Sequence, residues 1–187
     1  MCCGTKRLTE IRCPRDCPYL ATAREHPPAV SLRKQQRDVA LLIEYMRDFN
    51  EQQSQLFFMT SAFLVGYQPS ELQPVIDDDV ADAAGALAAT FETAGRGVIY
   101  EHRPTSAPAE HLATALKALF AEAGGRARGS FERDAAVVLR RIETAVSGIR
   151  KFEPEGRRPL LDLLGRMIRN SPGDEPQGQA APRLIVP

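Results

Sequence analysis

Six stretches of the sequence repeat apolar residues every three or four positions, which is the spacing of one face of an α-helix. They span residues 31–49, 51–67, 77–98, 106–124, 130–149 and 160–168. Glycine, proline or a polar capping residue separates each stretch from the next, and none shows the alternation of apolar and polar residues typical of a strand. The sequence therefore predicts an all-α fold, an up-and-down bundle of about six main helices.

Composition divides the chain into three parts. Residues 1–30 contain all four cysteines, residues 31–170 contain the helical stretches, and residues 171–187 are rich in proline, glycine and glutamine. We therefore expect a cysteine-rich metal-binding segment, a helical bundle and a disordered C-terminal tail. No apolar stretch approaches the roughly 20 residues of a membrane-spanning helix, and Lys6 and Arg7 stand where a secretory signal would be apolar. These features predict a cytoplasmic protein without a membrane span.

The charges cancel over the whole chain but not locally. Residues 1–37 carry 8 basic and 3 acidic side chains, residues 38–101 carry 2 and 11, and residues 102–170 carry 13 and 8. A net charge of zero removes the whole-chain argument for nucleic-acid binding. We expect neighbouring helices to neutralise each other, and the alternative is that the charged blocks attract a protein partner or a second copy of the chain.

All four cysteines lie near the N-terminus, as Cys2, Cys3, Cys13 and Cys17. Two disulfides are not expected in a reducing cytoplasm, whereas four thiolates satisfy a tetrahedral zinc ion completely. A site of this kind has no open position for water, so its role is structural rather than hydrolytic. The spacing differs from the paired Cys-x-x-Cys pattern of the commonest zinc sites. The number of thiols nevertheless favours structural zinc.

Other uses of the cysteines stay open. An iron–sulfur cluster also takes four thiolates, and His26 can replace one cysteine as a zinc ligand. Thiols activated by Arg12 and Arg15 would make the protein a thiol-based redox sensor. A Met-Cys-Cys start followed by basic residues also suits an acylated anchor, which would leave Cys13 and Cys17 unexplained.

Outside the cysteines, Glu101 and His102 are the best candidates for proton transfer. We expect them at the end of the helix predicted over 77–98, where they would extend its buried face, with Glu92 two to three turns back on a neighbouring stripe. A helical bundle can hold such a carboxylate and imidazole site, but the Glu-x-x-His pairs of dinuclear centres do not occur in this sequence. An ordinary pair of polar residues at a helix end is the competing explanation.

The same predicted helix has two structural features. Asp77, Asp78 and Asp79 stand at its start, where a carboxylate can cap free N–H groups, and capping is favoured over a calcium site because spaced ligands are missing. A stripe of small residues on this helix predicts a close contact with another helix, and its members are Ala81, Gly85, Ala88 and Gly95.

These observations favour a metal-binding helical protein that acts as a regulatory or protein-interaction module. An iron–sulfur or thiol-based redox protein is the first alternative, and an enzyme that uses Glu92, Glu101 and His102 is the second. Nucleic-acid binding by the basic N-terminal segment is less favoured than protein binding, because Tyr19 is its sole aromatic residue.

Overall fold

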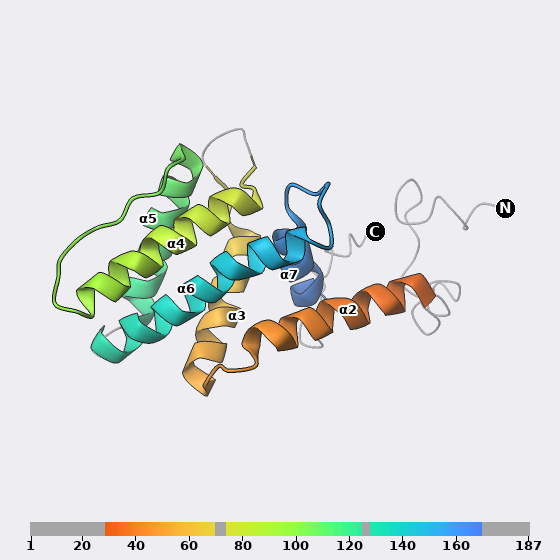
Figure 1. Cartoon of the computed structure of the whole chain (residues 1–187), viewed down its shortest axis with the longest axis horizontal. Helices are drawn as coiled ribbons and strands as arrows, with labels where there is room; N and C mark the ends of the chain where they lie inside the picture. The colour runs from red at the N-terminus through yellow and green to blue at the C-terminus, as the bar shows by residue number, and fades with distance from the viewer. Residues whose placement is uncertain (1–28, 70–73, 125–127, 170–187) are drawn as a thin grey trace, which may run out of the picture. The chain divides into compact units, whose positions relative to one another are not determined.

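The structure is a computed structural model that describes residues 29–69, 74–124 and 128–169. Within these ranges it contains six α-helices and no strand, so the predicted all-α fold is confirmed there (Figure 1). The helices are α2 (Ala29–Met46), α3 (Glu51–Gly66), α4 (Asp77–Ala94), α5 (Ala107–Gly124), α6 (Arg128–Arg150) and α7 (Pro159–Arg169). Over the same ranges, no helix combines the length and the apolar character that crossing a membrane requires.

The chain divides into two compact units, residues 1–43 and 44–187. Helix α2 crosses this boundary, and its first part is the described portion of the first unit. The predicted cysteine-rich segment and C-terminal tail lie outside the described residues. The second unit contains α3 to α7, and the fold described below is that of its residues 44–69, 74–124 and 128–169.

Helices α4 and α6 form the most extensive helix pair of the second unit (Figure 1). They run antiparallel, because Asp78 at the start of α4 pairs with Arg150 at the end of α6, while Glu92 near the end of α4 pairs with Arg140. The buried apolar side chains of this pair include Val80, Leu87, Val138, Leu139, Ile142 and Ile149. Helices α3, α5 and α7 also pack against α6. The core of the unit therefore lies around α6.

Small residues of α4 permit its close approach to α6. Gly85 and Ala88 are buried, and a Cβ atom added to Gly85 would lie 2.6 Å from the Glu143 Oε1 atom of α6. The close helix contact predicted from the small-residue stripe is therefore found at Gly85. Gly95, a later member of the predicted stripe, is exposed beyond the end of the helix.

Helix α4 ends earlier than its apolar pattern predicts. The Val98 N–H group donates to the Thr93 carbonyl oxygen (3.0 Å), and the Gly97 N–H group donates to that of Ala94 (2.9 Å). Together with the positive φ of Gly97 (80°), these bonds form a Schellman motif, which terminates a helix at a glycine. The prediction that the helix reaches Val98 and carries Glu101 and His102 at its end is therefore wrong. Val98 is 54% exposed rather than buried.

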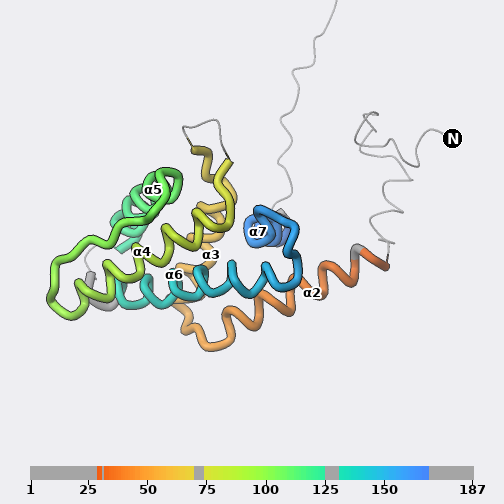
Figure 2. The backbone as a smooth tube through the Cα atoms, turned by 45° about the horizontal axis from the view of Figure 1, so that its top comes forward, coloured from red at the N-terminus to blue at the C-terminus, as the bar shows by residue number. Residues whose placement is uncertain are grey.

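The segment between α4 and α5 runs back along α4. The His102 N–H group donates to the Thr90 hydroxyl oxygen (2.9 Å), and the Thr105 N–H group donates to Asp82 Oδ2 (2.7 Å). Helix α5 consequently starts beside the start of α4, and the two helices run parallel (Figures 1 and 2). The up-and-down order predicted for the bundle is therefore wrong at this connection.

Asp77 connects α4 with α7. Its side chain is fully buried, and its carboxylate accepts hydrogen bonds from the N–H groups of Leu160 (2.6 Å) and Leu161 (3.2 Å), in the first turn of α7. The Asp77 N–H group in turn donates to the Arg157 carbonyl oxygen (3.1 Å). A cap by one of the three aspartates was predicted for α4, and Asp79 provides it by accepting a hydrogen bond from the backbone N–H group of the N-cap residue (3.1 Å), whereas Asp77 caps α7. Figure 2 shows α7 nearly end-on beside the C-terminal part of α6.

Candidate functional site

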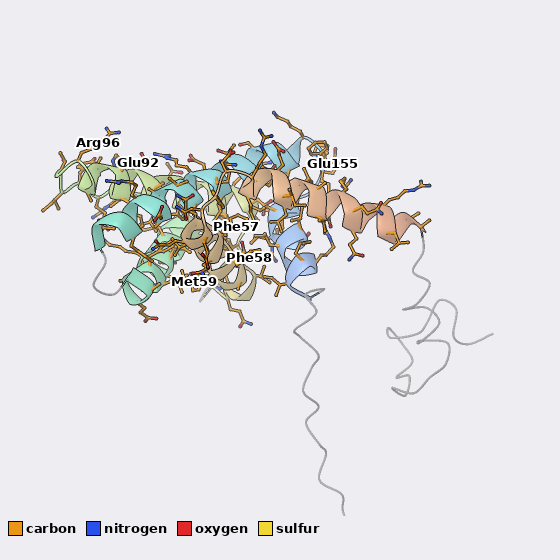
Figure 3. All side chains as sticks on the ribbon, turned by 90° about the horizontal axis from the view of Figure 1, so that it is seen from below. Phe57, Phe58, Met59, Glu92, Arg96 and Glu155 are labelled. Carbon is orange, nitrogen blue, oxygen red and sulfur yellow. The ribbon has the colours of Figure 1, made fainter. Side chains whose placement is uncertain are left out.

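A hollow of about 490 Å³ lies between the end of α4 and the middle of α6. Helix α4 and the turn after it contribute Phe91, Glu92, Gly95 and Arg96, and α6 contributes Arg133, Ala136, Val137, Arg140, Arg141 and Thr144. We call this hollow the arginine groove. Its α6 residues recur at positions three or four apart, which places them on one face of the helix. Figure 3 shows Glu92 and Arg96 near each other at the end of α4.

Arg140 is held in place at the centre of the arginine groove. Its Nε and Nη2 atoms donate to the two oxygens of Glu92 at 2.8 and 2.9 Å, and its Nη1 atom donates to Glu143 at 2.9 Å. The hydrogen bond from Arg140 is the main reason why the pKa of Glu92 lies below its ordinary value. The two carboxylates raise the pKa of Arg140. The cluster joins one guanidinium group to two carboxylates, so Arg140 has no positive charge left to offer a ligand.

Arg141 is also occupied by the protein itself. Its Nη1 atom donates to the Tyr45 carbonyl oxygen (2.9 Å), and its Nη2 atom lies 3.7 Å from Asp48 Oδ2. The guanidinium carbon stands 5.3 Å from the centre of the Phe49 ring, at cation–π distance. Arg141 thus fastens the turn between α2 and α3 to α6.

Arg96 and Arg133 differ from the two arginines between them. Both are exposed, and neither guanidinium group makes a hydrogen bond or an ion pair with any residue that the structure describes. Arg96 acts on Glu92 at a distance, as a minor cause of its lowered pKa. The arginine groove therefore presents two guanidinium groups, one from each of its walls, whose hydrogen-bonding capacity faces solvent.

Apolar atoms lie between these two cations. Val137 is 39% exposed in the groove although it belongs to a helix whose opposite face forms the core. Phe91 is partly buried and packs edge-on against Phe120, with ring centres 6.0 Å apart. A ligand that covered this floor would remove apolar surface from water, which is favourable.

The residues of the enzyme hypothesis are divided between two hollows. Glu92 lines the arginine groove, whereas Glu101 and His102 line a smaller hollow of about 120 Å³. The Glu101 carboxylate accepts a hydrogen bond from Lys117 Nζ (2.6 Å), which lowers the pKa of this exposed group. His102 packs edge-on against Tyr100, and its buried Nε2 atom has no hydrogen-bond partner in the described part of the chain. The structure does not bring these side chains together into one acid–base site.

The predicted zinc ligands Cys2, Cys3, Cys13 and Cys17, together with the alternative ligand His26, lie outside the described residues. Among residues 29–69, 74–124 and 128–169, no three side chains of the metal-binding types gather in a group that could hold an ion. Asp77, Asp78 and Asp79 instead make separate contacts: the first caps α7, the second pairs with Arg150, and the third accepts from the Ile76 N–H group (3.1 Å).

The arginine groove was missed by sequence reasoning. Arg133, Val137 and Arg140 are spaced four and three residues apart, so their common face on α6 was visible in the sequence. Their pairing with Phe91 and Arg96 depends on how α4 and α6 pack and was not visible. Comparison with known proteins adds no assignment, because no protein family, curated protein or solved structure matches this chain.

Proposed function

We propose that residues 44–169 form a protein-interaction module of a regulatory protein in the cytoplasm. The observation that carries this proposal is the arginine groove, where an apolar floor and two unpaired guanidinium groups face solvent. Arginine is enriched at protein interfaces, and its stem covers apolar surface while its head group binds carboxylates. An enzymatic role is less well supported, since Glu92 is already paired with Arg140 and Glu101 with Lys117.

Site-specific photocrosslinking tests the interaction function. A photoreactive phenylalanine analogue at Val137 should give a discrete crosslinked protein in cells that make this chain, because the side chain lies in the groove. The same analogue at Lys151, an exposed residue beyond the end of α6, is the matched control and should give none. Equal products from both positions, or no product from Val137, would refute the module.

We further propose that Cys2, Cys3, Cys13 and Cys17 bind structural zinc. The support is the sequence alone: four thiols gathered in a short segment, with Pro14 and Pro18 fixing the backbone after two of them. The ion would organise the N-terminal segment and would not take part in catalysis.

Metal analysis of the full-length protein, purified without oxygen, tests the zinc proposal. We expect one equivalent of zinc and no absorption in the visible range, because Zn²⁺ is a d¹⁰ ion. Cys13→Ser should lower the zinc content, while Glu10→Gln in the same segment should not. A brown protein that contains iron would contradict the zinc proposal and indicate an iron–sulfur cluster. A metal-free protein with four reactive thiols would contradict it in favour of the thiol-based redox alternative.

A further inference from the structure

We infer that the arginine groove binds an acidic segment of a partner protein in which carboxylates flank a large apolar side chain. This inference rests on the proposed interaction function and names the chemistry of the partner. It starts from two guanidinium groups that form no hydrogen bond or ion pair with the described residues, those of Arg96 on one wall and Arg133 on the other.

The charge of the lining selects an anionic partner. Four arginines and one glutamate line the groove, and the contacts within the fold account for Arg140 through Glu92 and Glu143, and for Arg141 through Asp48. Counting these three carboxylates against the four arginines leaves a net charge of +1, and the guanidinium groups without an ion pair among the described residues are those of Arg96 and Arg133. A planar guanidinium group can bind a carboxylate with two parallel hydrogen bonds, which fixes the orientation of the bound group.

The floor of the groove selects an apolar side chain between the carboxylates. Phe91, Ala136 and Val137 lie there. The Val137 side chain is exposed on this face and is not part of the apolar core of the second unit. A volume of about 490 Å³ accommodates a few side chains rather than a folded domain. This size is suited to a short helix or extended segment that lays one face into a groove.

Nucleic acid fits the same groove less well. Glu92 lines the groove and would face the phosphates of a strand, which carry one charge at every nucleotide. Stacking on bases needs exposed aromatic faces, and the only aromatic residue in this lining, Phe91, is partly buried against Phe120. A peptide can carry its carboxylates at chosen positions and an apolar side chain at others, whereas a nucleic-acid strand carries a phosphate at every nucleotide.

Fluorescence anisotropy with a labelled synthetic peptide tests this inference. The probe has leucines at helical spacing with glutamates between them. Three ligands are compared with it: the same peptide with lysine in place of glutamate, the same peptide with serine in place of leucine, and single-stranded DNA. We expect the glutamate–leucine peptide to bind most tightly, because it alone offers both carboxylates and apolar side chains. Its affinity should fall as salt is raised, since the contacts at Arg96 and Arg133 are exposed.

Charge reversal locates the binding. The double variant Arg96→Glu, Arg133→Glu should weaken peptide binding at least about tenfold, and Val137→Asp should weaken it by a similar factor. Lys151→Glu changes an exposed charge outside the groove and should leave the affinity unchanged. Because these side chains are exposed, all the variants should keep the far-ultraviolet circular dichroism of the parent protein.

The inference is overturned if DNA binds more tightly than the glutamate–leucine peptide, if the charge reversals leave the affinity unchanged, or if sedimentation shows a dimer that these reversals dissociate. If a partner is crosslinked at Val137 and the yield of this product is unchanged in the double variant Arg96→Glu, Arg133→Glu, this inference is overturned while the interaction function stands. Failure of the crosslinking itself would remove both.

Discussion

Asp77→Ala is expected to lower the free energy of unfolding by about 3 kcal/mol at neutral pH, as the sum of a lost helix cap and two unsatisfied N–H groups. The carboxylate is fully buried and is the acceptor for the Leu160 and Leu161 N–H groups at the start of α7. Alanine removes both acceptor oxygens, and the two N–H groups are left without a hydrogen-bond partner at a buried position. Urea unfolding followed by circular dichroism measures the difference.

Asp78→Ala is the matched control. Asp78 is the next residue of α4, but its side chain is exposed and pairs with Arg150 at the surface. Surface ion pairs contribute at most about 1 kcal/mol, so this variant should remain close to the parent in stability. If the two variants had equal effects, Asp77 would not be the cap of α7.

The effect of Asp77→Ala should also depend on pH. Burial is the main cause that raises the pKa of Asp77, and the nearby Asp162 adds to it, against the Leu160 and Leu161 hydrogen bonds and the charge of Arg150. The folded state therefore holds the Asp77 proton more tightly than the unfolded state, whose aspartate pKa is about 3.9. Stability from this group is greatest below that value and decreases as pH rises through the raised pKa. The difference between parent and variant should accordingly be larger in acid than at neutral pH.

Local signals explain why the helices could be predicted and the path of the chain could not. The period of the apolar residues indicated six helices, because that pattern reflects the face each helix buries. The Schellman motif at Gly97 and the return of the next segment to Thr90 and Asp82 depend on hydrogen bonds formed only after α4 exists. The acidic start of α4 likewise predicted a cap, which Asp79 provides, while the capping of α7 by Asp77 joins residues far apart in the chain.

The candidate site was predictable on one of its walls only. The α6 wall follows from the spacing of Arg133, Val137 and Arg140. The search for chemistry gave weight to Glu101 and His102 instead, because acid–histidine pairs are characteristic of catalysis. In the structure α4 ends before these residues, which line a different hollow from Glu92, and Glu101 is paired with Lys117. The pairing of Arg140 with Glu143, three residues away on α6, follows from sequence spacing. Which other arginines are paired depends on Glu92 and Asp48 reaching α6 from elsewhere in the chain, and the sequence does not show these contacts.

Leu139→Ala is expected to lower the free energy of unfolding by about 3 kcal/mol, the middle of the range for removing a buried leucine side chain from a packed core. Leu139 is fully buried although it lies beside the main apolar stripe of α6, which runs through Val138 and Ile142. The buried face of α6 is wide because α3, α4, α5 and α7 all pack against it. The sequence pattern indicates only the centre of such a face, and Leu139 lies at its flank.

Val137→Ala on the same helix should cost less than about 0.5 kcal/mol, since Val137 is partly exposed in the arginine groove and surface substitutions have small effects. Chemical unfolding of both variants compares two faces of α6 that are only two residues apart in sequence. A large decrease in the free energy of unfolding for Leu139→Ala and a small one for Val137→Ala would mean that the Val137 side chain contributes little to stability. Equal losses would mean that α6 is rotated relative to α4, and the groove with its two unpaired arginines would then not exist.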